Sequence, residues 1–268
     1  MLLETSGLTK RFGGITAVDE VDFGLEEGEL CSIIGPNGAG KTTFFNLLTG
    51  VLEPTAGSVS FDAGDGSVDL TGADPHETAL AGIHRSYQIT NLFPTLSVLE
   101  NVRVAAQAHH GNDAWKLWRN VREFDAHYDE AYGILERVGL AEDAETVAQN
   151  LSHGEKRTLE IAVALAGDPD LLLLDEPTAG VSSEGVDDVV DIIEDVSSDH
   201  SVMLIEHNME IVMGISDRVA VLHRGSLIAD GPPDEVSGDP KVREAYLGGY
   251  GHEETDDGAD PATDGGTA

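Results

Sequence analysis

The stretch at residues 35–43 constrains this chain more than any other, because its sequence is Gly-Pro-Asn-Gly-Ala-Gly-Lys-Thr-Thr. It fits the pattern G-x-x-x-x-G-K-[ST], in which glycines let successive backbone N–H groups curl around phosphate oxygens. A strand-like run precedes it and a helix-like run follows, and the dipole of that helix favours the same anion. A chance glycine-rich turn is the alternative. We predict that nucleotide phosphates are bound by Gly35, Pro36, Asn37, Gly38, Ala39, Gly40, Lys41, Thr42 and Thr43.

Two carboxylates follow an apolar run later in the chain. Leu171–Leu174 has the composition of a buried parallel strand, and Asp175 and Glu176 come directly after it. Parallel sheets bind ligands at the carboxyl ends of their strands, so these side chains should meet the phosphates. We expect Asp175 to hold Mg²⁺, directly or through water, together with the Thr42 hydroxyl. Glu176 would orient or deprotonate the water that attacks the phosphate bound by Lys41.

The charge balance narrows the possible partners. The 268 residues include 15 Lys and Arg against 50 Asp and Glu, a formal net charge of −35. The segment 251–268 holds six of these acids and no Lys or Arg, so the rest of the chain has 44 Asp and Glu against 15 Lys and Arg. Nucleic-acid binding needs a basic footprint, and we therefore expect no nucleic-acid partner.

The same excess of acids suggests a salt-rich cytoplasm. At ~1 M salt the Debye length is about 3 Å, so the global repulsion of an anionic nucleotide would hardly reach the loop. We interpret the acids as a solvated surface, with an ordinary acidic protein as the alternative. Cys31 is the only cysteine, and its apolar surroundings predict a core thiol. Neither a membrane span nor a signal peptide is recognisable, so we expect a cytoplasmic chain whose membrane role depends on a partner.

The apolar pattern predicts an α/β protein. Strands are expected at 2–8 and 18–25, and a hairpin at 58–70, which makes the N-terminal part antiparallel. Strands and helices alternate after residue 150, and this pattern indicates a mainly parallel sheet with flanking helices. Residues 251–268 are poor in apolar side chains and should form a disordered acidic tail.

A helical insertion is expected between these parts, from about residue 89 to 165. Within it, apolar and aromatic residues recur every three or four positions, as on one face of a helix. We expect this face to be the core of a helical subdomain rather than a ligand site. Its members are Trp115, Trp118, Val121, Phe124, Tyr128, Tyr132, Leu135 and Val138.

A third motif, Leu151-Ser152-His153-Gly154-Glu155, opens an expected helix at 155–166. With the loop and the strand carboxylates, it resembles the ATP-binding-cassette (ABC) ATPases, a class of P-loop NTPases whose signature is Leu-Ser-Gly-Gly-Gln. The resemblance implies that ATP bound by one subunit is contacted by Ser152 and Gly154 of another, in a head-to-tail sandwich dimer. His153 and Glu155 depart from the signature, but the serine and the second glycine are intact.

Other residues match the family one by one. Gln88, after the expected strand 83–87, corresponds to the glutamine that touches Mg²⁺ and the attacking water. His207 corresponds to the histidine that contacts the γ-phosphate, and Phe12 to the aromatic residue that stacks on adenine. Without the resemblance, each would be a surface, capping or turn residue. Ser182 stands where the family usually has aspartate, which leaves one dimer contact in doubt.

Residues 1–250 resemble one branch of the family in particular, the LivG-type ATPase subunits of branched-chain amino-acid importers. The similarity lies in the segments 85–88, 92–102, 159–162, 214–218 and 244–249. It implies an ATPase with ATP and Mg²⁺ as cofactors, attached to the cytoplasmic face of the membrane. It also implies two permease subunits, a second identical or homologous ATPase subunit and an external substrate-binding protein.

Three alternatives stay open from the sequence. Urea and amide importers, and a lipopolysaccharide exporter ATPase, have similar subunits, so the substrate class depends on the resemblance alone. A soluble ABC ATPase acting on DNA or ribosomes is disfavoured by the single cassette and by the acidity. A catalytically silent regulator is disfavoured by intact Glu176 and His207.

Overall fold

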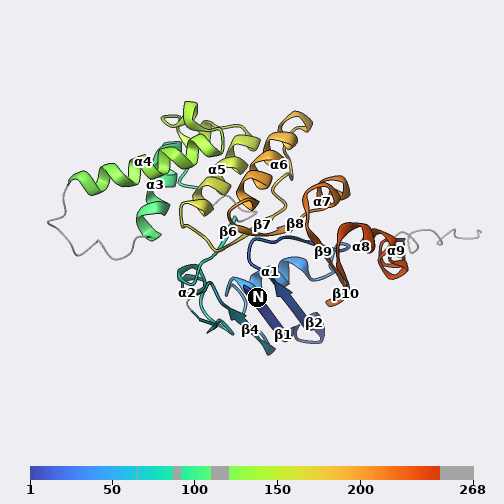
Figure 1. The fold of residues 1–268 in the computed structure, drawn as a ribbon. Helices are drawn as coiled ribbons and strands as arrows, with labels where there is room; N and C mark the ends of the chain where they lie inside the picture. Colours follow the sequence, from blue (N-terminus) through green and yellow to red (C-terminus); the bar gives the residue numbers. More distant parts are fainter. Residues whose placement is uncertain (65, 87–91, 110–120, 248–268) are drawn as a thin grey trace, which may run out of the picture.

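The computed structural model describes residues 1–64, 66–86, 92–109 and 121–247, and the side chains of these except 109 and 121–125. Alternating apolar residues near the N-terminus form an antiparallel sheet in the order β2-β1-β4-β5 (Figure 1). This arrangement confirms the predicted N-terminal strands and the hairpin. Its strands are β1 (Leu3–Phe12), β2 (Ile15–Leu25), β4 (Ala56–Phe61) and β5 (Val68–Asp69).

A second sheet of six strands runs through the middle of the molecule in the order β10-β9-β3-β8-β7-β6. Neighbouring strands from β9 through β3, β8 and β7 to β6 pair in parallel. Strand β10, at one edge of the sheet, pairs antiparallel with β9. This sheet confirms the mainly parallel architecture. Its strands are β3 (Leu30–Ile34), β6 (Ile83–Ser86), β7 (Leu171–Asp175), β8 (Ser201–Ile205), β9 (Arg218–His223) and β10 (Ser226–Gly231).

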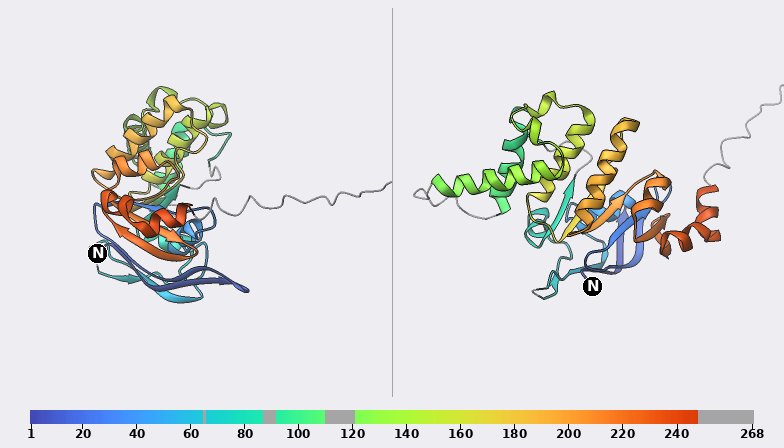
Figure 2. Two further views of the ribbon diagram at one scale, coloured as in Figure 1. Left: turned by 90° about the vertical axis from the view of Figure 1, so that its right-hand side faces the viewer. Right: turned by 45° about the horizontal axis from the view of Figure 1, so that its top comes forward.

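The helices cover both faces of the six-stranded sheet (Figures 1 and 2). Helix α1 lies between the two sheets, while α3, α4, α5 and α6 gather on the opposite face. The helices are α1 (Lys41–Leu48), α2 (Pro75–Leu80), α3 (Val98–His109), α4 (Val121–Arg137), α5 (His153–Leu165), α6 (Ser183–Ser197), α7 (Met209–Ile215), α8 (Pro233–Gly238) and α9 (Pro240–Leu247).

Alternation along β7 explains how one strand serves two cores. Leu171 and Leu173 face the cluster around α1, whereas Leu172 and Leu174 face the cluster formed by the helical segments. Burial on both faces requires a wholly apolar strand, as the sequence has here. The Cys31 thiol on β3 is also fully buried, as predicted, and burial raises its pKa above the ordinary value.

The predicted aromatic face of the helical insertion is only partly a core. Leu135 and Val138 are buried, but Tyr128 and Tyr132 are 38% and 42% exposed. Tyr128 instead donates a hydrogen bond to Glu100 on α3, because its hydroxyl needs a polar partner. The expectation was therefore wrong for the two tyrosines. Trp115 and Trp118, and the side chains of Val121 and Phe124, lie outside the described residues.

None of the helices in the described ranges has the length and apolar character needed to cross a membrane.

Candidate functional site

The loop at 35–43 joins the end of β3 to the start of α1, as predicted. Two of its glycines are required by close backbone contacts. A Cβ atom on Gly35, where φ is 149°, would lie 2.0 Å from the carbonyl oxygen of Leu222. A Cβ atom on Gly40, where φ is 107°, would lie 2.3 Å from the carbonyl oxygen of Ala17. No larger residue fits at either position, so glycine sets the shape of this loop.

Lys41 folds back across the loop. Its Nζ donates a hydrogen bond to the carbonyl oxygen of Gly35 at 2.7 Å and makes a longer contact with that of Pro36 at 3.4 Å. Burial lowers the pKa of Lys41, while Glu176 and Asp175 act in the opposite direction. The ammonium group thus lies within the electrostatic reach of both strand carboxylates. Thr42 follows it in the first turn of α1, with an exposed side chain.

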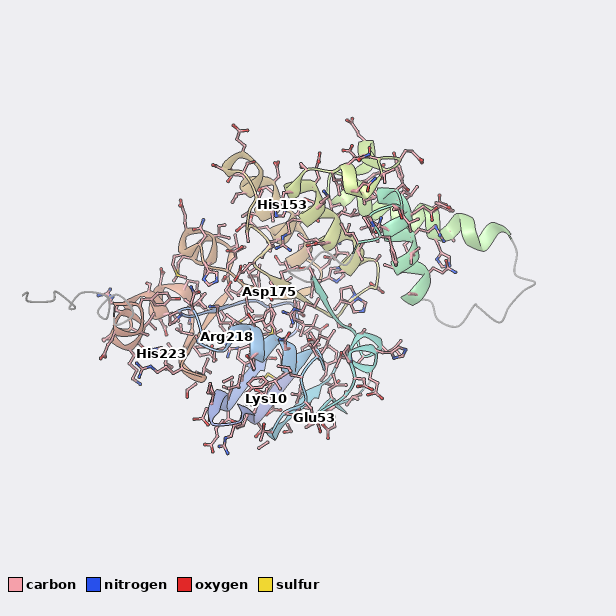
Figure 3. The ribbon with its side chains drawn as sticks, turned by 180° about the vertical axis from the view of Figure 1, so that it is seen from behind. Lys10, Glu53, His153, Asp175, Arg218 and His223 are labelled. Atoms are coloured by element: carbon pink, nitrogen blue, oxygen red, sulfur yellow. The ribbon has the colours of Figure 1, made fainter. Side chains whose placement is uncertain are left out.

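Asp175 ends β7 in the centre of the molecule (Figure 3). It pairs in register with Ile205 on β8, and Ile205 pairs with Ile33 on β3, immediately before the loop. Its Oδ2 atom accepts a hydrogen bond from the Arg85 guanidinium. Its Oδ1 atom is buried and has no hydrogen-bond partner among the described residues.

An unpaired carboxylate oxygen in such a position suits a divalent cation. A buried polar oxygen without a partner is costly, and a metal ion or its bound water would satisfy it. Carboxylate and hydroxyl oxygens, as in Asp175 and Thr42, are the hard ligands that Mg²⁺ prefers. The residues present therefore fit Mg²⁺.

Glu176 and His207 lie side by side after two neighbouring strands. The backbone N–H of Glu176 donates to the carbonyl oxygen of Ile205 at 2.8 Å, and the Glu176 φ angle of 51° turns the chain sharply away from β7. A non-glycine residue in this left-handed region stores strain, as often happens at functional sites. Nε2 of His207 then lies 2.9 Å from Oε1 of Glu176.

Glu206 holds the two loops together, and sequence reasoning missed it. This buried carboxylate accepts hydrogen bonds from the backbone N–H of Thr178 at 3.0 Å and from its hydroxyl at 2.6 Å. Its other oxygen accepts from the backbone N–H of His207 at 3.0 Å. The acid thus bridges the segment after Glu176 to the segment containing His207. An acidic residue continuing an apolar strand was the available signal.

The segment around Ser152 starts helix α5 with a capping box. The backbone N–H of Glu155 donates to Oγ of Ser152, while the backbone N–H of Ser152 donates to the Glu155 carboxylate at 2.6 Å. These hydrogen bonds lower the pKa of Glu155 and keep it charged at the helix N-terminus. Glu155, which stands where the family signature has glutamine, therefore preserves this helix start.

A cavity of about 730 Å³ lies beside this motif. It is lined by Ser152, His153 and Gly154, and also by Ser182, the residue before α6. None of its described lining residues belongs to the loop at 35–43. The signature segment and Ser182 therefore share one surface, separate from the phosphate loop of the same chain.

Of the two remaining predicted residues, Phe12 and Gln88, the structure describes only Phe12. Phe12 ends β1 with its ring 47% exposed and with the Lys10 ammonium 5.3 Å from the ring centre. It is therefore available for stacking and is not a packed turn residue. Gln88 lies outside the described residues.

Comparison with known proteins decides the family. Residues 18–179 match the ABC transporter family. This chain belongs to the ABC transporter family. A shorter segment, residues 226–252, matches the branched-chain amino acid ATP-binding cassette transporter family. The resemblance inferred from the motifs is confirmed.

Relatives of this ABC cassette are similar along nearly their whole length. The high-affinity branched-chain amino acid transport ATP-binding protein BraF of Pseudomonas aeruginosa is 39% identical, over 92% of this chain and 98% of BraF. The corresponding protein LivG of Escherichia coli K12 is 38% identical with the same coverage. A probable LivG of Archaeoglobus fulgidus is 35% identical, over 92% of this chain and 95% of the relative.

Solved structures confirm the ABC ATPase fold. The ADP conformation of an ATP-binding cassette from an ABC transporter has a TM-score of 0.79 and 31% identity, covering 92% of this chain and 98% of that one. A dimeric cassette in a post-hydrolysis state, bound to ADP and Pi, has a TM-score of 0.72 and 25% identity. It covers 87% of this chain and 99% of its own. The cassette here is an ATP-binding ATPase of this fold.

Proposed function

We propose that this chain is the ATP-hydrolysing subunit of an importer for branched-chain amino acids. The names and the 38–40% identity of the BraF and LivG relatives support the substrate class. The observation that carries the hydrolytic role is the contact between Glu176 and His207. It joins the ends of β7 and β8 beside the loop after β3, so the proposed base and its partner stand next to the phosphate cradle.

The site residues divide into three roles. Backbone N–H groups of 35–43 and the Lys41 ammonium bind the phosphates, and Phe12 stacks on adenine. Thr42, Asp175 and Gln88 would hold Mg²⁺, which would supply positive charge to offset that of the phosphates. Glu176 accepts a proton from the attacking water as the new P–O bond forms and ADP leaves. His207 orients Glu176 and contacts the γ-phosphate.

The site is completed by a second ATPase subunit, identical or homologous. Ser152 and Gly154 line a different cavity from the loop at 35–43, so both halves of a nucleotide site are available on separate surfaces. The likeness to a dimeric cassette bound to ADP and Pi supports this arrangement. ATP binding closes the sandwich dimer, and hydrolysis reopens it. Ser182 stands at one expected dimer contact, where the family usually has aspartate.

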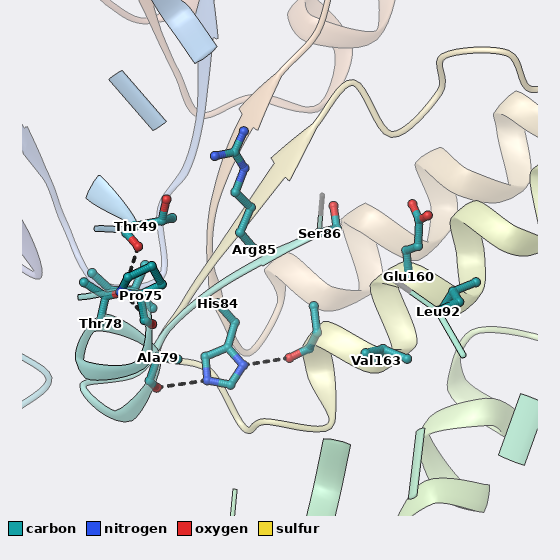
Figure 4. Close-up of a pocket in the computed structure, with 12 residues that line it drawn as sticks. Thr49, Pro75, Thr78, Ala79, His84, Arg85, Ser86, Leu92, Glu160 and Val163 are labelled. Atoms are coloured by element: carbon teal, nitrogen blue, oxygen red, sulfur yellow. Dashed lines mark hydrogen bonds between the residues drawn. The ribbon is translucent and has the colours of Figure 1, made fainter. Parts of the chain in front are cut away.

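A groove between α2, β6 and α5 is the proposed contact with a permease subunit. The cavity there is about 240 Å³, and it lies where the helical segments meet the six-stranded sheet (Figure 4). Apolar Leu92 and Val163 and the carboxylate of Glu160 contribute to its lining. Two permease subunits, each with one ATPase, and an external substrate-binding protein would form the importer. The cassette would then sit on the cytoplasmic face of the membrane.

The remaining organisation follows the same proposal. Residues 1–250 form the ABC ATPase domain, with the helical insertion at about 89–165, and 251–268 form an acidic tail. The charge of −35 supports a halophilic protein adapted to a salt-rich cytoplasm.

Co-purification from native membranes tests this function. Two permease subunits should co-purify with the cassette. The associated external binding protein should bind leucine, isoleucine or valine. A binding protein that takes urea or amides instead would overturn the substrate class. Recovery of the cassette with ribosomes or DNA, and without permeases, would overturn the transport role.

A further inference from the structure

Arg85 connects three elements next to the proposed magnesium site. It lies on β6, and its side chain extends away from that strand (Figure 4) to partners on α1 and β7. The side chain is only 4% exposed, and that of its partner Asp175 is 2% exposed. A buried arginine of this kind must satisfy its charge locally, so its contacts define its position.

Those contacts are directional. Nη2 donates to Oδ2 of Asp175, and Nη1 donates to Oδ1 of Asn46 on α1 at 2.6 Å. The guanidinium also lies over the ring of Phe45, 5.5 Å from its centre. Two nitrogen atoms and one ring therefore fix the plane of the group. The carboxylate of Asp175 is thereby held against the first helix after the phosphate loop.

Only one oxygen of Asp175 is used by this contact. Oδ1 stays without a hydrogen-bond partner among the described residues, as noted above. Hydrogen bonds from outer residues commonly orient the carboxylates that bind metals, and their loss costs roughly 10–100-fold in metal affinity or activity. Arg85 has the contacts of such an outer residue. Because it is a cation, a purely electrostatic effect would act in the opposite sense and weaken metal binding.

We propose that Arg85 is a positioning residue that orients Asp175 for Mg²⁺, building on the magnesium site of the proposed function. The guanidinium holds Oδ2 and leaves Oδ1 for the cation. Its hydrogen bond to Asn46 ties the guanidinium to α1, the helix whose first turn carries Thr42. The same arginine lines the groove between α2, β6 and α5, so the occupant of that groove lies one side chain away from a metal ligand.

The test measures metal-dependent nucleotide binding rather than turnover. A fluorescent, non-hydrolysable ATP analogue is titrated into the full chain with Mn²⁺ as the divalent probe and again with EDTA. The ratio of the two affinities isolates the contribution of the cation. In Arg85→Met this ratio should fall roughly 10-fold or more, while affinity in EDTA stays close to that of the parent. A parental or larger ratio in Arg85→Met would overturn the proposal.

Arg218→Met is the matched control. Arg218 lies on β9 of the same sheet, forms a bidentate ion pair with Asp230 and lies over the Phe23 ring, 5.3 Å from its centre. Its loss removes a comparable set of contacts far from Asp175 and should leave the Mn²⁺/EDTA ratio unchanged. An equal fall in both variants would indicate a general structural effect and contradict the proposal.

Two further variants separate the possible failures. Asp175→Asn should abolish most of the Mn²⁺ effect, and if it does not, the proposed magnesium site itself is wrong. If Asp175→Asn loses the effect but Arg85→Met keeps it, only the role of Arg85 is wrong. Arg85→Lys covers the case in which the methionine variant does not fold. Lysine keeps the charge but not the two-nitrogen geometry, so a smaller loss is expected, and a parental ratio would again overturn the proposal.

Discussion

Nε2 of His207 lies 2.9 Å from Oε1 of Glu176, although the two residues are 31 positions apart in the sequence. The parallel sheet produces this proximity, because β7 and β8 are hydrogen-bonded neighbours that end at the same edge. Glu176 turns away from β7 through a left-handed backbone conformation, and His207 follows β8 after Glu206. The parallel sheet thus places the proposed base and the histidine next to each other.

Replacing His207 should therefore impair turnover more than nucleotide binding. His207→Ala removes the hydrogen bond that orients Glu176 and, in our proposal, a contact to the γ-phosphate. Loss of one such preorganised group typically lowers kcat about 10²–10³-fold. Steady-state ATPase kinetics and analogue binding by the same preparation provide the measurement. A fall in affinity with kcat unchanged would contradict the orienting role.

Glu206→Ala should destabilise the segments that follow β7 and β8, because Glu206 bridges Thr178 to His207. The variant leaves the N–H and hydroxyl of Thr178 and the N–H of His207 without their buried acceptor. Hydrogen bonds to a charged group are worth about 1.5–3 kcal/mol each, so the free energy of unfolding and kcat should both fall. Glu206→Gln retains one acceptor oxygen and should recover part of both. Equal stability and turnover in all three proteins would show that the bridge is unimportant.

Lys41 should make the stability of the nucleotide-free chain depend on pH. Its pKa is lowered from 10.5 mainly by burial, so between the lowered value and 10.5 the unfolded chain binds more protons than the folded one. Stability contributed by this group must then rise with pH in that window. The difference in Tm between the parent and Lys41→Met should move in favour of the parent as the pH rises toward 10.5. A constant difference, or one that moves toward the variant, would contradict the burial argument.

Salt should affect this chain strongly because of its 50 acids. Raising KCl from about 0.15 M to about 2 M shortens the Debye length to a few ångströms or less. Self-repulsion then weakens, so both Tm and ATPase rate should increase over this range. Thermal unfolding and turnover measured side by side provide the test. Full stability and activity at the lower concentration would refute adaptation to a salt-rich cytoplasm.

The parts of the site that could be predicted from sequence are those defined by local patterns. The loop at 35–43, the apolar strand ending in Asp175 and the helix start at Ser152 each combine a short motif with a matching element. Local spacing determines such features, because glycine conformation, strand burial and capping act within a few residues. Those elements are found where the patterns placed them.

The features that were missed depend on contacts between distant segments. Arg85 reaches Asn46 and Asp175 across 39 and 90 residues, and no spacing rule reports such a contact. Helical periodicity likewise placed Tyr128 on the same helix face as Leu135. It did not show that neighbouring helices bury Leu135 and leave Tyr128 exposed. Periodicity defines which residues share a face, but tertiary packing decides how much of that face is buried.

The most direct test of the whole account is ATP hydrolysis by Glu176→Gln. Glutamine keeps the size of the side chain and a hydrogen-bonding group for His207, but it cannot accept the proton of the attacking water. We predict that turnover falls at least about 10²-fold, within the usual range for a general base, while ATP affinity is retained. Size-exclusion chromatography with ATP and Mg²⁺ should show a trapped dimer. Hydrolysis by Glu176→Gln at the parental rate would contradict the central claim that Glu176 is the base.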